Sequence, residues 1–308
     1  MARRILCLLD QEDDATLPWA LPMLKSLSQT CLVQVLCKAQ HAALFHQLPW
    51  LAPPLVAYHP GSWPRLLWQL RRQVWDSIWD LSLPPLTPWR QTLPFLLPSA
   101  HRLLLAGSSP FKAQRLPFNQ QQHVSERFTQ ALATLQLSPH HQWLPPLAPK
   151  EQDLLARIGE REIVAINLLD DDGQVFMPLV EQFRALLNGL PRMALVLLHP
   201  RPEALGDLQS PRLFYLDGGA DLGGWQVLAR AKSLLGIDSA WVHRAAVLGV
   251  GQLAIFPEDG QYLSRWHPND LHALIWRHPK DAPLPVAELL TQLRKLQKTL
   301  KEPNLSLV

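Results

Sequence analysis

The sequence predicts an α/β protein made of two Rossmann-like domains that face a cleft. Short apolar runs alternate with helical patterns along the chain, which is typical of βαβ units and parallel sheets. A proline-rich segment without periodicity, residues 138–150, separates two halves of similar length. With 308 residues, 47% of them hydrophobic and 18% charged, each half is long enough to bury its own core.

The elements of the first half follow from periodicity. Pro18 fits the first turn of a helix, and Val124, Phe128 and Ala131 form one apolar stripe. In chain order we expect strand 4–9, helix 17–28, strand 32–37, helix 65–74, strand 77–83, strand 101–106 and helix 122–135.

The second half repeats the alternation and ends in a basic amphipathic helix over residues 286–300. Before it we expect strand 163–169, helix 180–187, strands 193–198 and 213–216, helix 224–232, strand 233–237, helix 242–248 and strand 252–256. The predicted boundaries are therefore 1–145 for the first domain, 151–285 for the second, and 286–308 for the terminal helix and tail.

Composition excludes several classes of protein. A net charge of +3 is too small to indicate a nucleic-acid protein, and three cysteines without metal-ligand spacing favour reduced thiols in the cytoplasm. The histidine clusters lack ligand spacing too, so no metal site is expected. The longest uncharged stretch, residues 40–64, contains five prolines and therefore predicts no membrane span.

The most informative segment runs from residue 221 to 250. A helix leads into strand 233–237, and Asp238, Ser239 and Ala240 then open a new helix that carries His243. Strand ends bind ligands in open α/β sheets, and a helix N-terminus suits a phosphate. Alternatively, Asp238 or Ser239 simply caps the helix and His243 packs in the core.

This segment resembles the donor-binding region of glycosyltransferase family 9, the ADP-heptose:lipopolysaccharide heptosyltransferases. The matching pattern is Asp-Ser-Ala-x-x-His-x-Ala-Ala-x-Leu-Gly, from Asp238 to Gly249. An aromatic-Asp strand end at Trp79-Asp80 and a His-x-x-x-Arg motif at residues 123–127 agree in order.

The resemblance implies a GT-B fold and an inverting, metal-independent sugar transfer from an ADP-sugar to a lipopolysaccharide core or other glycan. The ADP-sugar is a substrate, so no cofactor is implied. The acceptor would bind the first domain and the donor the second, in the cytoplasm, with peripheral contact at the inner membrane. The family's first-loop base corresponds to Asp13 or Asp14. The donor pocket corresponds to Asp238, Ser239, Ala240, His243, Gly224 and Arg244.

Two departures from the family leave alternatives open. The first loop lacks the usual glycine, so its acidic run is either the base or a solvated turn that caps the next helix. The second-domain loop carries three aspartates, residues 170–172, where the family has a lysine. Either Mg²⁺ bridges them to phosphates or they form an exposed turn.

Two functions follow from these departures. One is an active transferase in which His243, Arg244 or Arg265 replaces the missing cation. The other is a catalytically degenerate homologue that serves as a binding or scaffold protein.

Two further features have two interpretations each. Seven of the twelve tryptophans lie in the segment from Trp19 to Trp89. They either pack in the core of the first domain or form an aromatic surface for a sugar or lipid. The terminal basic helix either closes the second domain or contacts an anionic membrane.

Overall fold

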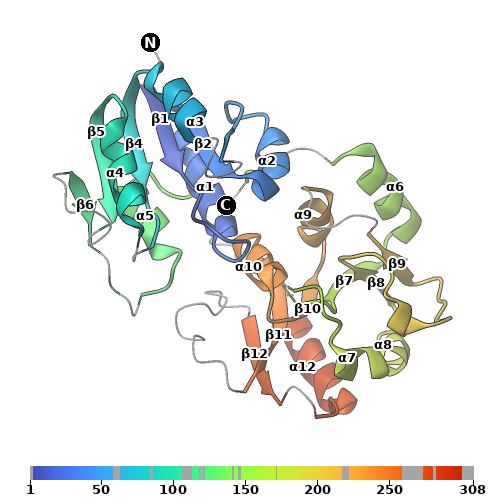
Figure 1. Ribbon diagram of the computed structural model, residues 1–308. Coiled ribbons are helices and arrows are strands. Elements are labelled where there is room, and N and C mark those ends of the chain that lie inside the picture. Colours follow the sequence, from blue (N-terminus) through green and yellow to red (C-terminus); the bar gives the residue numbers. More distant parts are fainter. Residues whose placement is uncertain are drawn as a thin grey trace. The chain divides into compact units, whose positions relative to one another are not determined.

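A computed structural model describes residues 3–57, 63–83, 86–105, 113–117, 119, 122–140, 142–144, 147–170, 172–216, 222–258, 273–279 and 282–299. The chain divides into two compact units, Met1–Pro145 (unit 1) and Pro146–Val308 (unit 2). Each unit is a parallel sheet covered by helices (Figure 1). The predicted α/β fold class is confirmed, while the groove between the domains stays a prediction.

Unit 1 contains a six-stranded sheet in the order β3-β2-β1-β4-β5-β6. Helices α3 and α4 bury leucines in one core cluster with β1 and β4, and α1 packs against α5 and β2. The strands are β1 (Arg3–Leu8), β2 (Cys31–Lys38), β3 (Leu55–Ala57), β4 (Trp75–Asp80), β5 (Ser99–Leu105) and β6 (Gln114–Leu116). The helices are α1 (Leu17–Ser28), α2 (Ala39–His46), α3 (Trp63–Arg71), α4 (Pro88–Leu96) and α5 (Glu126–Ala133).

Unit 2 repeats this order, with its sheet running β12-β11-β10-β7-β8-β9. Helices α7, α8 and α12 contribute to one core cluster, and α6, α9 and α10 to the other. The strands are β7 (Glu162–Asn167), β8 (Met193–Leu197), β9 (Leu213–Tyr215), β10 (Ser233–Ile237), β11 (Gly251–Pro257) and β12 (Ala273–His278). The helices are α6 (Pro149–Ile158), α7 (Met177–Glu181), α8 (Phe183–Gly189), the 3-10 turn η2 (Glu203–Leu205), α9 (Leu222–Leu228), α10 (Ala240–Val247) and α12 (Val286–Thr299).

The central strands are apolar because helices cover both faces of each sheet. All five residues of β10 are buried, and so are five of the six residues of β7. In both units the first strand lies beside the fourth, which is the Rossmann order. The carboxyl ends of these adjacent strands are where such sheets bind ligands, so functional residues are expected there.

Several elements differ from the expectations. Strands β3, β6 and β12 and helices α2, α4 and α6 were not predicted. Helix α6 begins at Pro149, inside the expected linker and ahead of the expected domain start at residue 151, because proline is well suited to the first helical position. Helix 180–187 is instead two short helices, α7 and α8.

The terminal helix α12 packs on β10, β11 and α8 of unit 2. Its leucine stripe, including Leu289, Leu293 and Leu296, is buried, and its Arg and Lys side chains are exposed. Among the described residues, no helix is both long and apolar enough to cross a bilayer.

Candidate functional site

Buried ion pairs anchor the loop that follows β1. The Arg90 guanidinium of α4 donates to Asp10 at 2.8 Å and to Asp80, at the end of β4, at 2.6 Å. All three side chains are at most 2% exposed. Burial alone lowers the pKa of Arg90, but its two carboxylate partners outweigh that effect and raise it, so the guanidinium stays charged.

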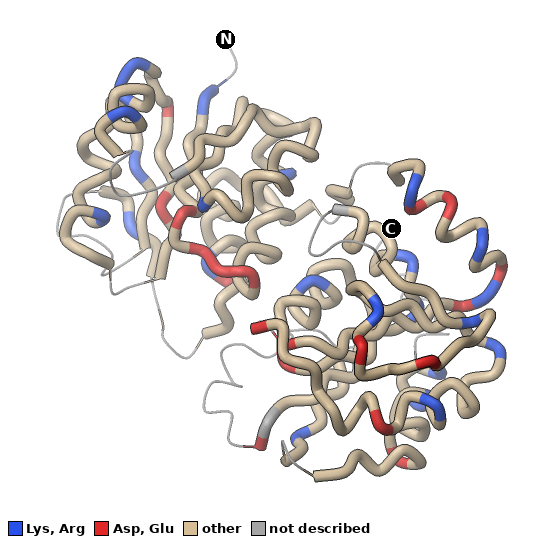
Figure 2. The backbone as a smooth tube through the Cα atoms, turned by 45° about the vertical axis from the view of Figure 1, so that its right-hand side comes forward, with Lys and Arg blue, Asp and Glu red and all other residues tan. Residues whose placement is uncertain are grey.

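A second buried pair holds the next turn of the same loop. Arg127 of α5 donates to Glu12 at 2.5 Å and to the carbonyl of Leu81 at 2.9 Å. Asp10 and Glu12 are therefore buried by these ion pairs. Asp13 and Asp14, which follow them in the chain and precede α1, are exposed. The acidic run is the red stretch of unit 1 that follows β1 in Figure 2.

The two predicted base residues have different surroundings. Asp13 Oδ1 accepts hydrogen bonds from Thr16 N at 2.8 Å and Thr16 Oγ1 at 2.7 Å, ahead of α1. Asp14 Oδ1 lies 2.7 Å from Nε2 of His41 in α2. Asp13 therefore fixes the turn that precedes α1 through Thr16, the N-cap residue, whereas Asp14 forms an Asp–His pair.

The pair joins an accessible carboxylate to a buried imidazole. The side chain of Asp14 is 48% exposed and that of His41 only 5%. Within the described part of the chain, Nδ1 of His41 has no hydrogen-bond partner. Nε2 is the ring nitrogen that faces Asp14, and the Asp14 side chain is partly exposed to solvent.

In unit 2, Ser239 links the ends of β7 and β10. Its hydroxyl donates to the carbonyl of Ile237 at 3.0 Å and accepts from Asn167 Nδ2 at 2.8 Å. The hydroxyl makes no capping hydrogen bond to α10. Ser239 thus occupies the N-cap position of α10, as the alternative interpretation expected, but its hydroxyl is bonded to Ile237 and Asn167 and not to the helix N–H groups.

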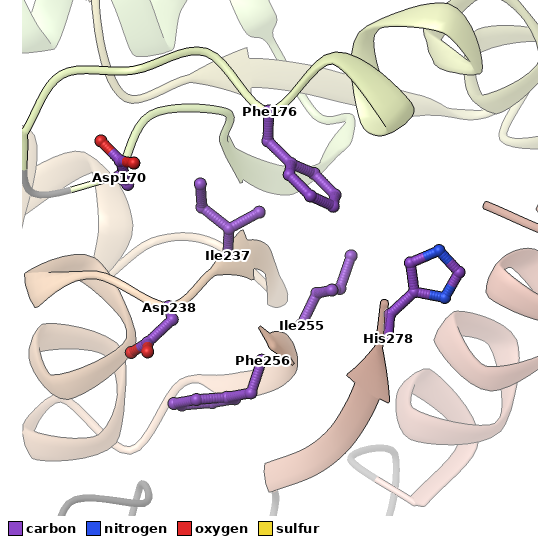
Figure 3. A pocket seen from close by; sticks show the side chains of 7 residues that line it. All are labelled: Asp170, Phe176, Ile237, Asp238, Ile255, Phe256 and His278. Atoms are coloured by element: carbon purple, nitrogen blue, oxygen red, sulfur yellow. The ribbon is translucent and has the colours of Figure 1, made fainter. Parts of the chain in front are cut away.

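A pocket of about 200 Å³ opens beside this turn (Figure 3). Phe176, Ile237 and Ile255 point toward one another in the centre of the view, with the His278 ring on one side and the carboxylates of Asp170 and Asp238 on the other. Phe256 completes the lining. The pocket is therefore an apolar slot with a carboxylate rim, and the described residues that line it include neither Lys nor Arg.

The aspartate run forms a tight turn. Asp170 Oδ1 accepts hydrogen bonds from the backbone N–H groups of Asp172 and Gln174, and Gly173 has φ +76°. Asp172 is exposed, and Asp171 lies outside the described residues. The structure thus agrees with the exposed-turn interpretation. Among the described residues, no group of three or more His, Cys, Asp or Glu is arranged to hold a metal ion.

The other predicted donor residues lie where α9 meets α10. A Cβ on Gly224 would be 2.5 Å from the Trp241 ring, so only glycine allows this contact. The Arg244 guanidinium lies 5.2 Å from the Trp225 ring centre and 4.3 Å from that of Trp241. Ala240, His243 and Arg244 are buried, and Asp238 is exposed. Arg265, the other predicted cation, lies outside the described residues.

Sequence reasoning missed several polar residues at these strand ends. Asn167 and His278 end their strands, and His41 lies in a helix that was not predicted. His199, just after β8, accepts from Leu168 N at 3.3 Å and pairs with the Pro200 carbonyl at 2.7 Å. Burial lowers the pKa of His199 despite this second bond. Asn167 and His199 each come directly after an apolar run that forms a strand. That pattern could have predicted them as polar residues at strand ends, where such sheets bind ligands.

Two Rossmann-ordered units in one chain define a GT-B-like α/β fold, and comparison with solved structures agrees. The structure of E. coli ADP-heptose lipopolysaccharide heptosyltransferase II matches with a TM-score of 0.72 over 97% of this chain and 99% of that chain, at 15% identity. E. coli heptosyltransferase WaaC with ADP matches with a TM-score of 0.69 over 95% and 99% of the two chains, at 15% identity. A family 9 glycosyl transferase from Veillonella parvula matches with a TM-score of 0.68 over 97% and 89%, at 11% identity.

At these identities the similarity establishes the fold. No protein-family model and no curated protein sequence matches the chain.

Proposed function

We propose that the protein is a divergent family 9 glycosyltransferase. It transfers a heptose or a related sugar from an ADP-sugar to a lipopolysaccharide core or other glycan, with inversion and without a metal. The observation that carries this proposal is the match to heptosyltransferases along nearly the full length of both chains. The accessible Asp14–His41 pair in unit 1 and the Ser239 turn in unit 2 supply chemistry that suits the two substrates.

Asp14 is the base in this proposal. Its carboxylate takes the proton of the acceptor hydroxyl as that oxygen attacks the anomeric carbon and the bond to the diphosphate breaks. Asp13 is less suited because one of its carboxylate oxygens already accepts two hydrogen bonds from Thr16. His41 donates from Nε2 and holds the carboxylate in place, so it is a positioning residue.

The N-terminus of α10 receives the donor diphosphate in this proposal. The first N–H groups of a helix and its dipole favour an anion, and the Ser239 hydroxyl does not compete for them. Arg244, in the last turn of α10 and buried against two tryptophan rings, is the cation that would take the place of the missing lysine. The apolar slot beside Asp238 then takes an uncharged part of the donor, because its carboxylate rim repels phosphate.

ADP release from ADP-heptose, with a heptose-deficient lipopolysaccharide acceptor, tests the proposal. Asp14→Asn should lower the rate by about 100-fold or more. Asp13→Asn should retain most of the rate but lower the melting temperature. Asp153→Asn, which removes an exposed carboxylate on α6, is the matched control. If Asp13→Asn abolishes release and Asp14→Asn does not, the assignment of the base is wrong.

A specific observation favours one second candidate, a non-catalytic binding or scaffold protein. Two carboxylates and no described cation line the pocket, so the electrostatic part of a transferase site is weakened there. Calorimetry with ADP separates the candidates. Binding that is lost when Arg244→Gln is introduced supports the transferase, and absence of both nucleotide binding and ADP release supports the scaffold.

A further inference from the structure

Unit 1 has a pocket of its own at the end of its sheet that the proposed reaction does not use. The pocket has a volume of about 450 Å³ and opens beside the end of α5, at the amino ends of the adjacent strands β1, β4 and β5 (Figure 1). Ligands of such sheets ordinarily bind at the opposite, carboxyl ends. We call it the amino-end pocket, and its lining includes Arg3, Ile5, Ser77, Trp79, His101 and Leu103.

The lining residues share one face of the sheet because of the strand register. Ile5 lies beside Ser77, and Ser77 lies beside His101. Parallel neighbours in register point to the same face, and so do residues two apart in one strand. Ile5, Trp79 and Leu103 are each 3% exposed and form the floor. The indole N–H of Trp79 already donates to the Ser77 hydroxyl at 3.0 Å, so the floor offers an apolar surface with an aromatic ring.

The rim of the amino-end pocket carries polar groups that the fold does not use. The side chains of Arg3, His101 and Gln114 line the pocket and are exposed. Within the described part of the chain, none of these three side chains makes a hydrogen bond or an ion pair. Arg102 differs, because its guanidinium donates to three backbone carbonyls between α4 and β5. Uncommitted polar groups around an apolar floor are what orient a ligand in a small-molecule site.

The charge of the rim favours an anion. Arg3 and Arg102 supply two fixed positive charges, and Asp76 supplies one negative charge. Asp76 Oδ2 already accepts the backbone N–H of Arg4 at 2.7 Å, so the protein itself stabilises part of this negative charge. The Arg3 guanidinium can donate two parallel hydrogen bonds to a carboxylate or sulfonate. A ligand with an apolar body and one anionic group therefore matches both the floor and the rim.

We propose that the amino-end pocket binds a small amphipathic anion, with its apolar body on Trp79 and its anionic group on Arg3. The volume falls within the range of small-molecule sites, about 300–1,000 Å³. A nucleoside diphosphate fits less well, because its additional charge is repelled by Asp76 and it has little apolar surface for the floor. The pocket lies at the opposite strand ends from Asp14, so its binding does not require turnover. Its failure would leave the proposed transferase untouched.

Two fluorescent probes with one ring system test the proposal on the full-length protein. Anilinonaphthalene sulfonate is an amphipathic anion, and N-phenylnaphthylamine is the same aromatic amine without the sulfonate. Arg3→Gln should weaken binding of the sulfonate by about tenfold and change binding of the uncharged amine by less than about twofold. The matched control, Arg161→Gln, removes an exposed arginine just ahead of β7, the first strand of unit 2, and should leave both affinities within about twofold.

Alkylation of Cys31 reports where the sulfonate binds. Cys31 lines the amino-end pocket and is partly exposed, whereas Cys7 and Cys37 are buried. Burial raises the pKa of both buried thiols, to about 12 for Cys37, so iodoacetamide should react first with Cys31. A sulfonate concentration about ten times its Kd should slow this reaction by about tenfold, because only the unoccupied protein reacts.

Four outcomes would each overturn the proposal. They are no binding of the sulfonate, binding that leaves Cys31 unprotected, an equal loss of both probes in Arg3→Gln, and an equal loss of the sulfonate in Arg3→Gln and Arg161→Gln. Unchanged melting curves of the two variants show that they are folded.

Discussion

Removing the guanidinium of Arg90 should strongly destabilise unit 1. The change Arg90→Leu leaves the carboxylates of Asp10 and Asp80 buried without a counter-charge. Breaking one buried pair costs about 3–5 kcal/mol, and here one cation serves two carboxylates. We therefore expect a loss of about 4 kcal/mol or more, a large part of the roughly 5–15 kcal/mol of a typical domain.

Urea unfolding followed by circular dichroism measures this loss. Arg71→Leu, an exposed arginine in the same unit, is the control and should stay within about 0.5 kcal/mol of the wild type. Adding Asp10→Asn and Asp80→Asn to Arg90→Leu should restore part of the loss, because it removes the uncompensated charge. A loss below about 1 kcal/mol for Arg90→Leu, or a triple variant no more stable than the single one, refutes the reasoning.

Three further outcomes are expected. Gly224→Ala should cost about 1–3 kcal/mol in a urea titration, because its new methyl overlaps the adjacent indole, whereas Gly236→Ala, whose nearest neighbour would be 3.5 Å away, should be nearly neutral. Burial lowers the pKa of His199 in the folded protein, because the folded state favours the neutral imidazole. The contribution of neutral His199 to folding stability is therefore complete above about pH 6.5 and is lost as the pH falls. Thermal unfolding from pH 7 to 5 should therefore show a smaller loss for His199→Gln than for the wild type, and parallel curves would contradict this. Asp13→Ala and Thr16→Ala should each cost about 1 kcal/mol, and the double variant less than their sum, because the two residues share hydrogen bonds.

The buried parallel strands could be predicted because their sequences carry one unambiguous signal. Residues 233–237 are apolar throughout apart from Ser233 and Gly236, and the predicted strand has the bounds of β10. β12 was not predicted although it opens on four apolar residues, Ala-Leu-Ile-Trp, and in the structure these residues are exposed or only partly buried. α4 was missed because Pro94 lies inside it, and proline ordinarily interrupts a helix.

The candidate site was predictable only where a motif is local. Asp238 and Ser239 follow their strand directly, so the pattern placed them at the strand end. The Asp14–His41 pair joins the segment after β1 to helix α2, and the Asn167–Ser239 hydrogen bond joins the ends of two adjacent strands. Such pairs depend on which strands become neighbours, and periodicity along one chain carries no information about that.

The strand order of both units has a kinetic consequence. Ile5 of β1 pairs with Ser77 of β4, and Val164 of β7 pairs with Ser233 of β10, so the centre of each sheet closes only after a long stretch of chain has been made. Non-local closure of this kind slows folding and leaves apolar strands unpaired in the meantime. During synthesis, β1 can pair with β2 early, but its other edge stays open until β4 has been made.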